Sequence, residues 1–416
     1  MYGLFSQSLL PPFMRSNIIA LGTIGTLVLP TEYPLLFLLK RLTVSDAASS
    51  PNADPPDNTK ASIFSTSLFT SDRSLSKFNW KLQEKKINKF NNFTTNIEGI
   101  KIHFIREKGS GKNPTPLLIL HGWPGSIVEF LEVIEKLAHP EKFGGNKEDS
   151  FDVIAPSLPG FGFSGAPKKP MGPRKISKIM NELMTKKLKY KKYIAQGGDW
   201  GATICNWLAY DYSKSCKAIH INCLTMRHPG GPKNKKEIEW EKKFINDQIM
   251  QEGYRTIQAT KPQSLSYSMN DSPVGVAAWI LEKFYSWSDI KNNNIESVYT
   301  KDILLTNIMI YLITNTFNSA SWIYFGRREE GGRNFPNNFK KINVPTGIAK
   351  FPKEMSEWPP KSYIERIFKI YQYSEMKRGG HFAALEQPDI LVKDLRKFLR
   401  SLKYNPYSHN GRGGSL

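Results

Sequence analysis

Short apolar segments alternate with stretches of helical spacing through the first half of the chain. The segments 116–120 (PLLIL) and 151–155 (FDVIA) are apolar at nearly every position, which predicts strands buried on both faces. Apolar residues recur at helical intervals in 126–137 and 176–188. The alternation in 96–106 (NIEGIKIHFIR) predicts one further strand ahead of them. Strands that alternate with helices predict a parallel sheet with helices on both faces.

The pattern changes between about residues 222 and 334. Strand signals fade there, and long stretches of helical spacing predict a helical block with a loop or turn region at 259–272. A strand pattern returns at 344–351, and a final helix is expected at 390–402. The fold class that follows is α/β: a mostly parallel sheet with helices on both faces and an inserted helical cap.

These patterns divide the chain into five parts. We expect an N-terminal segment (1–77), the first part of the α/β core (78–225), a helical cap (226–335), the second part of the core (336–405) and a flexible tail (406–416).

The N-terminal segment contains a candidate membrane anchor followed by a linker. Its two apolar runs, 18–29 and 35–39, are separated by Pro30, Glu32 and Pro34. The first run is short for a membrane span, which needs ~20 residues. A signal-like segment, a broken anchor and an interfacial hairpin therefore remain open.

The formal net charge of +21 raises the question of an anionic partner. The basic residues fall in several small clusters without an aromatic–basic motif, so we expect a lysine-rich surface and no nucleic acid. An acidic lipid surface remains open. The three cysteines show no C-x-x-C spacing, which excludes a disulfide framework and a thiolate metal site from the prediction.

The strongest local signal is 196–201 (QGGDWG), which follows an apolar strand and precedes a helical run. Small residues on both sides of Asp199 suit a sharp strand-to-helix turn, as in the G-x-S-x-G nucleophile elbow of α/β hydrolases with Asp in the serine position. A carboxylate with an ordinary pKa of ~3.9 needs no base near pH 7. It can attack a saturated carbon that carries a leaving oxygen. The alternative is a tight Gly-Asp turn or a helix N-cap.

The chain order nucleophile, acid, histidine indicates the partners of Asp199. His381 follows two glycines on a loop before a helix, and we expect it to be the general base. The acid should lie just after the penultimate strand, where Glu354 is the first candidate and Glu357 the second. A carboxylate there would orient the imidazole and stabilise its protonated form.

The run His121-Gly122-Trp123-Pro124 follows the early buried strand. Hydrolases of this kind place one oxyanion-binding N–H in that loop and the other on the residue after the nucleophile. The candidates are the backbone N–H groups of Trp123 and Trp200. The alternative is a structural turn with a packed Trp.

Two further stretches stand beside these motifs, 157–164 (SLPGFGFS) and 304–311 (LLTNIMIY). Together with HGWPG, QGGDWG and GGHFAALEQP, in this order and spacing, they resemble the microsomal and insect juvenile hormone epoxide hydrolases. The resemblance extends over about residues 78–403.

The resemblance implies conversion of a small apolar epoxide, such as juvenile hormone, a lipid epoxide or a xenobiotic epoxide, to a vicinal diol. It implies an ester on Asp199, with Tyr254 and Tyr324 of the cap as proton donors and His381 with Glu354 releasing the product. It implies no metal and no organic cofactor. It also implies the endoplasmic reticulum or microsomal membrane as the location.

Two other functions remain open at this stage. A haloalkane dehalogenase uses the same aspartate but needs halide-binding N–H donors, which Trp123 and Trp200 could supply. A non-catalytic relative that binds an apolar ligand is the second alternative. A serine esterase is disfavoured because no hydroxyl lies at position 199.

Overall fold

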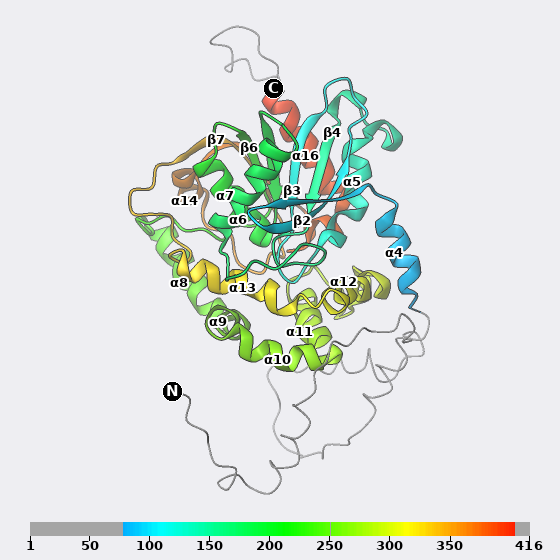
Figure 1. The fold of residues 1–416 in the computed structure, drawn as a ribbon. Helices are drawn as coiled ribbons and strands as arrows, with labels where there is room; N and C mark the ends of the chain where they lie inside the picture. Colours follow the sequence, from blue (N-terminus) through cyan, green and yellow to red (C-terminus); the bar gives the residue numbers. More distant parts are fainter. Residues whose placement is uncertain (1–77, 250, 404–416) are drawn as a thin grey trace, which may run out of the picture. The chain divides into compact units, whose positions relative to one another are not determined.

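An eight-stranded sheet forms the centre of the described part of the protein, residues 78–249 and 251–403 of a computed structural model (Figure 1). The candidate anchor, the linker after it and the predicted tail lie outside these residues. The strand order is β1-β2-β4-β3-β5-β6-β7-β8. The strands are β1 (Asn92–Ile97), β2 (Ile100–Glu107), β3 (Thr115–Leu120), β4 (Phe151–Pro156), β5 (Tyr193–Gly197), β6 (Cys216–Ile221), β7 (Ile342–Lys350) and β8 (Phe368–Glu375).

The sheet is mostly parallel, as the apolar strand patterns predict. The strands from β4 through β3 to β8 run parallel, whereas β1 and β2 add an antiparallel hairpin at one edge. In β3, Leu118 and Leu120 pack into one hydrophobic cluster and Leu117 and Ile119 into the other. This alternation follows from side chains pointing to opposite faces of a strand, so residues 117–120 of β3 must all be apolar.

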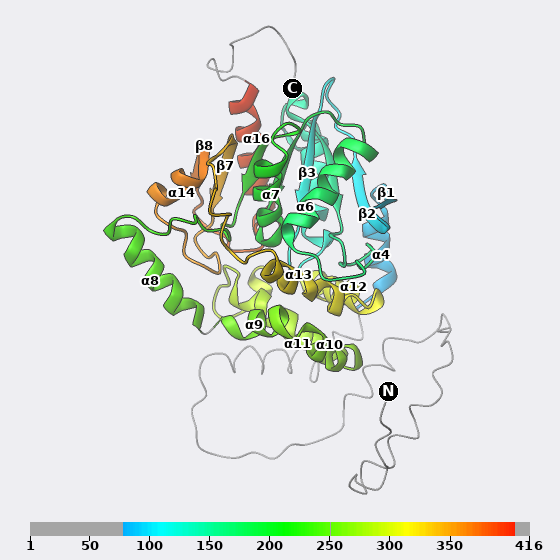
Figure 2. The same cartoon turned by 60° about the vertical axis from the view of Figure 1, so that its left-hand side comes forward.

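Helices cover both faces of the sheet (Figures 1 and 2). Helices α6 and α7 pack together over one face, while α5 and α16 pack together over the other. The helices outside the insertion are α4 (Trp80–Asn88), α5 (Leu131–Ala138), α6 (Pro173–Glu182), α7 (Asp199–Asp211), α14 (Lys361–Ile367), α15 (Ala383–Glu386) and α16 (Pro388–Lys403). The predicted α/β fold class is confirmed.

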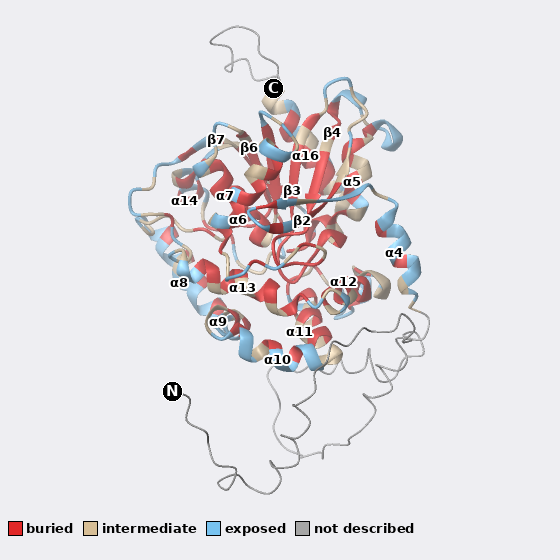
Figure 3. Ribbon diagram, viewed as in Figure 1, coloured by how far each residue is buried: buried red, intermediate tan, exposed pale blue. Residues whose placement is uncertain are grey.

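A helical insertion lies between β6 and β7 and gathers at one end of the sheet (Figures 1 and 2). Its helices are α8 (Lys235–Ile249), α9 (Glu252–Thr260), α10 (Pro262–Asp271), α11 (Pro273–Ser286), α12 (Lys301–Ile313) and α13 (Phe317–Glu329). Figure 3 shows their inner sides buried and the outer sides of α8 and α10 exposed. None of the helices in the described ranges is long and apolar enough to cross a membrane.

Two predicted elements differ from the structure. The single strand expected at 96–106 is part of the β1–β2 hairpin, whose turn residues Glu98 and Gly99 both have positive φ, 50° and 80°. The loop or turn region expected at 259–272 is wrong, because it holds the end of α9 and all of α10. Pro262 begins α10, where its fixed φ suits the first turn of a helix.

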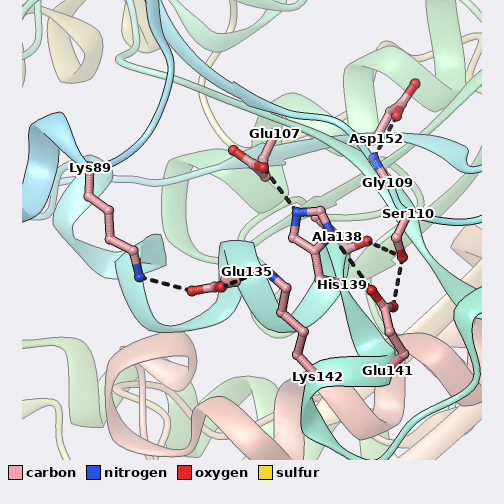
Figure 4. Close-up of polar contacts among 10 residues, drawn as sticks. All are labelled: Lys89, Glu107, Gly109, Ser110, Glu135, Ala138, His139, Glu141, Lys142 and Asp152. Carbon is pink, nitrogen blue, oxygen red and sulfur yellow. Dashed lines mark hydrogen bonds and ion pairs between the residues drawn. The ribbon is translucent and has the colours of Figure 1, made fainter.

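A polar network joins the carboxyl end of β2 and the amino end of β4 to the end of α5 (Figure 4). His139 Nε2 lies 3.0 Å from Glu107 Oε1, and Gly109 N–H donates to Asp152 Oδ1 at 2.8 Å. Glu135 bridges the ammonium groups of two lysines, Lys89 and Lys142. These contacts join β2, α5 and β4, and we assign them a structural role.

A buried pair on α16 offers a test of what holds this helix to the sheet. Asp394 Oδ2 lies 2.9 Å from His220 Nε2 on β6, and both residues are buried. We expect Asp394→Ala to lower the free energy of unfolding by about 3 kcal/mol, because it leaves a buried polar group unpaired. Urea unfolding measures this loss.

The control is Asp389→Ala in the first turn of the same helix, whose carboxylate is 82% exposed in its pair with Lys136 and should contribute less than about 1 kcal/mol. Burial is the largest single influence and raises the pKa of Asp394, but the hydrogen bond with His220, the charge of His220 and hydrogen bonds with other side chains together outweigh it, so the pKa is lowered. The loss of unfolding free energy caused by Asp394→Ala should therefore be largest at pH 7 and should become smaller as the pH falls below ~3.9. Equal losses for the two variants would contradict this assignment.

Candidate active site

Asp199 lies at the sharp turn between β5 and α7. Its φ of 43° falls in the left-handed region, which a residue with a side chain adopts only where its surroundings fix it. A Cβ on Gly201 would lie 1.9 Å from the carbonyl oxygen of Leu120, and a Cβ on Gly197 would lie 2.4 Å from the carbonyl carbon of Gly201. The glycines therefore permit the close crossing of α7 over the strand ends that presents Asp199.

The carboxylate of Asp199 contacts two loops. Its Oδ1 accepts a hydrogen bond from the backbone N–H of Trp123 at 2.8 Å, and its Oδ2 lies 3.5 Å from Nε2 of His381. The backbone N–H of Trp200 lies in the first turn of α7, where N–H groups have no carbonyl partner within the helix. The structure thus brings together Asp199, His381 and both predicted oxyanion-binding residues.

His381 is held against Glu354. Its Nδ1 lies 2.5 Å from Oε1 of Glu354, and the two side chains are only 1% and 3% exposed. The backbone N–H of His381 donates to the carbonyl of Trp287 at 2.9 Å. Glu357 instead pairs with Lys243 at 2.7 Å and is about half exposed. The structure therefore places Glu354, and not Glu357, beside the imidazole.

The two carboxylates set the charge of the imidazole between them. Burial lowers the pKa of His381, but the charge of Glu354 and hydrogen bonds with Asp199, Cys223 and Glu354 raise it well above its ordinary value. A protonated imidazole between Asp199 and Glu354 is the resting arrangement that follows.

Cys223, Glu354 and His381 lie near enough to one another to suggest a shared metal ion. Burial raises the pKa of the Cys223 thiol to about 12, so it stays neutral and is a poor metal ligand. The 2.5 Å contact between His381 and Glu354 leaves no space for an ion between their atoms. These residues therefore do not fit a metal site.

Tyr254 on α9 and Tyr324 on α13 lie on the cap side of the site, and both are buried. The ring of Tyr254 stacks on Trp123 with centroids 5.3 Å apart, and Tyr324 meets the ring of Trp200 edge-on at 4.7 Å. Burial first, and the charge of Asp199 among smaller causes, raises the pKa of both phenols. Both tyrosines therefore keep their protons at neutral pH.

Asp199, Trp200, Tyr254 and Tyr324 line one cavity. The space that the centre of a water-sized sphere can occupy in it is about 30 Å³. The remaining lining is partly apolar, with Phe244 and Met355, and partly basic.

Comparison with known proteins places this geometry in a family. A family model described as "Epoxide hydrolase N terminus" matches residues 65–130, and one described as "alpha/beta hydrolase fold" matches residues 115–270. Epoxide hydrolase 1 of Sus scrofa is 37% identical over 353 residues, which cover 78% of this chain and 78% of that protein. The chain belongs to the epoxide hydrolase family.

Two solved structures extend the comparison. The epoxide hydrolase of Aspergillus niger superposes with a TM-score of 0.74 and 28% identity, covering 89% of this chain and 95% of that one. The juvenile hormone epoxide hydrolase of the silkworm Bombyx mori superposes with a TM-score of 0.71 and 27% sequence identity. This match covers 88% of this chain and 92% of that one. The resemblance that the motifs carry is confirmed.

Sequence reasoning missed several residues near the site of this epoxide hydrolase. The carboxylate of Glu129 packs directly against Gly125: a Cβ added to that glycine would lie 1.7 Å from Oε1 of Glu129. Burial, together with the charge of Asp199, raises the pKa of Glu129 to about 8. Lys283 lies 4.2 Å from the ring centroid of Tyr254. Glu129 follows the HGWPG motif by four residues, which was the one local signal available. Lys283 gave none, because only the folded cap brings it to the site.

Replacing Gly122 with alanine tests whether the loop after β3 holds the carboxylate of Asp199 in place. An added Cβ would meet Asp199 Oδ1 at 2.1 Å and its Cβ at 2.5 Å, so the carboxylate must leave its place beside Trp123 and His381. Because a misplacement of about 1 Å can cost ~100-fold, we expect kcat for epoxide hydrolysis to fall by at least that factor. Diol formation measures the rate, and thermal unfolding shows whether the variant is folded.

The control is Gly253→Ala in α9, where an added Cβ meets no atom within 4 Å. It should keep the rate of the unaltered protein. A folded Gly122→Ala variant with full activity would show that Asp199 is not positioned by this loop.

Proposed function

We propose that this epoxide hydrolase converts apolar epoxides to vicinal diols through an ester formed on Asp199. One observation carries the proposal. The Asp199 carboxylate accepts the N–H of Trp123 on one oxygen and lies 3.5 Å from His381 Nε2 on the other, in a cavity that Tyr254 and Tyr324 also line. Nucleophile, base and proton donors thus converge on one small space.

In the first step, Asp199 attacks an oxirane carbon and the carbon–oxygen bond breaks. The released alkoxide takes a proton from Tyr254 or Tyr324. An alkoxide is a far stronger base than a phenolate, so the transfer is favourable although the pKa of each phenol is raised. The Trp123 N–H orients the carboxylate so that its second oxygen faces the substrate.

In the second step, the neutral imidazole of His381, which has given its resting proton to the tyrosinate or to solvent, takes a proton from water through Nε2, and the hydroxide formed attacks the carbonyl carbon of the ester. The tetrahedral intermediate collapses as the bond between that carbon and the substrate oxygen breaks. The alkoxide that leaves takes the proton from the imidazolium, which gives the diol and the free carboxylate of Asp199. The N–H groups of Trp123 and Trp200 stabilise the oxyanion, and Glu354 stabilises the imidazolium. Esterification removes the charge of Asp199 and its hydrogen bond to the imidazole, which is one of the causes that raise the pKa of His381. The ester itself therefore favours the neutral imidazole that the second step needs.

The substrate and the location are proposals of the same kind. The aromatic lining favours epoxides with an apolar body, and the similarity to a protein named juvenile hormone epoxide hydrolase adds that hormone to the candidates. We propose the endoplasmic reticulum membrane as the location, with residues 18–39, outside the described part, as the candidate attachment. The division into core and cap at residues 226 and 335 also stays a prediction.

A second candidate, haloalkane dehalogenase chemistry, is favoured by one feature. The indole N–H of Trp123 is buried and has no partner among the described residues, whereas Trp200 interacts with the hydroxyl of Tyr324. The indole N–H of Trp123 could bind a halide. The two tyrosines beside Asp199 favour the epoxide reaction instead. Chloride release from a chloroalkane, without diol release from the matching epoxide, would favour the dehalogenase.

Trapping of the ester tests the proposal. The variant His381→Gln should form the ester but fail to hydrolyse it, because no base activates water. Intact-mass spectrometry after addition of styrene oxide should show about one added epoxide per enzyme, located by peptide mapping at Asp199. Asp199→Asn, checked by mass for deamidation, should stay folded, form no adduct and make no diol.

A matched pair separates the two glutamates. Glu354→Gln should also accumulate the ester, whereas Glu357→Gln, which alters only the surface pair with Lys243, should not. Undiminished diol formation by Asp199→Asn would remove the mechanism.

A further inference from the structure

Four consecutive backbone N–H groups, those of residues 379–382, surround the imidazole on its loop, and each of them donates a hydrogen bond. The first, on Gly379, donates to Oδ2 of Asp289 at 2.9 Å. The third, on His381, donates to the carbonyl of Trp287 at 2.9 Å. Both acceptors belong to the loop that follows α11 in the helical insertion. The insertion therefore holds the histidine loop at two points.

The carboxylate of Glu386, on α15, accepts the other two N–H groups. Its Oε2 accepts the N–H of Gly380 at 2.8 Å, and its Oε1 accepts the N–H of Phe382 at 3.0 Å. Oε2 also accepts the backbone N–H of Asp289 at 2.8 Å. One carboxylate thus joins the histidine loop to the insertion loop. Asp289 and Glu386 are both buried, where a carboxylate is costly unless N–H groups satisfy its oxygens.

Trp287 places the insertion loop beside two groups of the proposed reaction. Its ring centroid lies 5.0 Å from that of His381 and 5.5 Å from that of Tyr254. The indole is almost fully buried, at 1% exposure, so it cannot move without displacing these neighbours. A shift of the insertion loop would therefore move the imidazole relative to the carboxylate of Asp199.

The carboxylates of Asp289 and Glu386 contact the backbone and not the reacting groups. In the described ranges, neither forms a hydrogen bond or an ion pair with the imidazole or with Asp199. They can act on the reaction only through the loop that they hold. The first proposed step uses Asp199 and the tyrosines, whereas the second step requires Nε2 of His381 to be aimed at water beside the ester. The second step is therefore the one that depends on the position of this loop.

We infer that Asp289 and Glu386 are positioning residues for the hydrolysis of the ester. Together they lock the histidine loop to the insertion loop and so keep Nε2 of His381 directed at the carbonyl carbon of the Asp199 ester. This inference rests on the proposed function and adds two residues to its second step.

Removal of the Asp289 side chain tests the inference. In Asp289→Ala, the N–H of Gly379 loses its acceptor and the imidazole is held less firmly. We expect the rate constant for ester hydrolysis to fall about tenfold or more, because a small misplacement of a reacting group is costly. The rate constant for ester formation should stay within about twofold, since it does not need the base. Rapid mixing with styrene oxide, an acid quench and intact-mass spectrometry measure both steps, and the ester should accumulate.

Two matched variants separate positioning from a general loss of stability. Asp289→Asn keeps an acceptor oxygen for Gly379 and should restore most of the rate that Asp289→Ala loses. Lys291→Ala removes the 65% exposed partner of Asp289 and should leave both rate constants unchanged. Thermal unfolding shows whether each variant is folded. A folded Asp289→Ala variant that hydrolyses the ester as fast as the unaltered protein would overturn the inference.

Glu386→Gln is a second test that keeps the shape of the side chain. An amide has one acceptor oxygen, whereas the two oxygens of Glu386 accept three N–H groups, so at least one N–H loses its acceptor. Burial raises the pKa of Glu386 to about 7, and an assay at about pH 8.5 keeps the carboxylate of the unaltered protein charged. Ester hydrolysis should again slow about tenfold while ester formation changes little.

Two results would contradict the inference in folded Glu386→Gln: an unchanged rate of ester hydrolysis, or equal slowing of both steps. A different result would identify failure of the proposed function. If neither the unaltered protein nor His381→Gln forms an ester with styrene oxide, the proposed function is overturned, and this inference with it.

Discussion

The close crossing of α7 over the ends of β3 and β5 is the constraint on which the site depends. A side chain at position 201 would collide with the carbonyl of Leu120, so the helix can approach this closely only with glycine there. The approach forces Asp199 into a left-handed conformation and turns its carboxylate toward the N–H of Trp123. In the mechanism that we propose, His381 and the cap tyrosines can act only because the carboxylate of Asp199 is held at this point.

Charged groups of opposite sign alternate beside Asp199, from its carboxylate to the imidazole of His381 and the carboxylate of Glu354. Two carboxylates, Asp199 and Glu354, flank the imidazole of His381 in a buried setting, where charges interact more strongly than in water. In the mechanism that we propose, ester formation would remove the charge of Asp199 and would lower the proton affinity of that imidazole, which is the direction that hydrolysis requires.

Sequence predicted those features that a short local pattern encodes. The turn at Asp199 was predictable because its glycines must stand at fixed offsets, and β3 because a strand covered on both faces is apolar throughout. The sequence alone could not decide between Glu354 and Glu357, because both follow the same strand. The packing of the loop decides which of the two contacts His381. Lys283 reaches the site only when the cap folds over it, so no local pattern in the sequence indicates its position. The β1–β2 turn was missed because Glu98 is an unusual residue at positive φ.

The origin of the oxygen in the diol tests the central claim most directly. Excess enzyme should be mixed with epoxide in water enriched in oxygen-18, so that each enzyme molecule turns over at most once. If Asp199 forms the ester, the first diol should contain ordinary oxygen from the carboxylate, and the heavy isotope should appear in the peptide that carries Asp199. Heavy oxygen in the first diol, with none in that peptide, would show that water attacks the epoxide directly and would contradict the account.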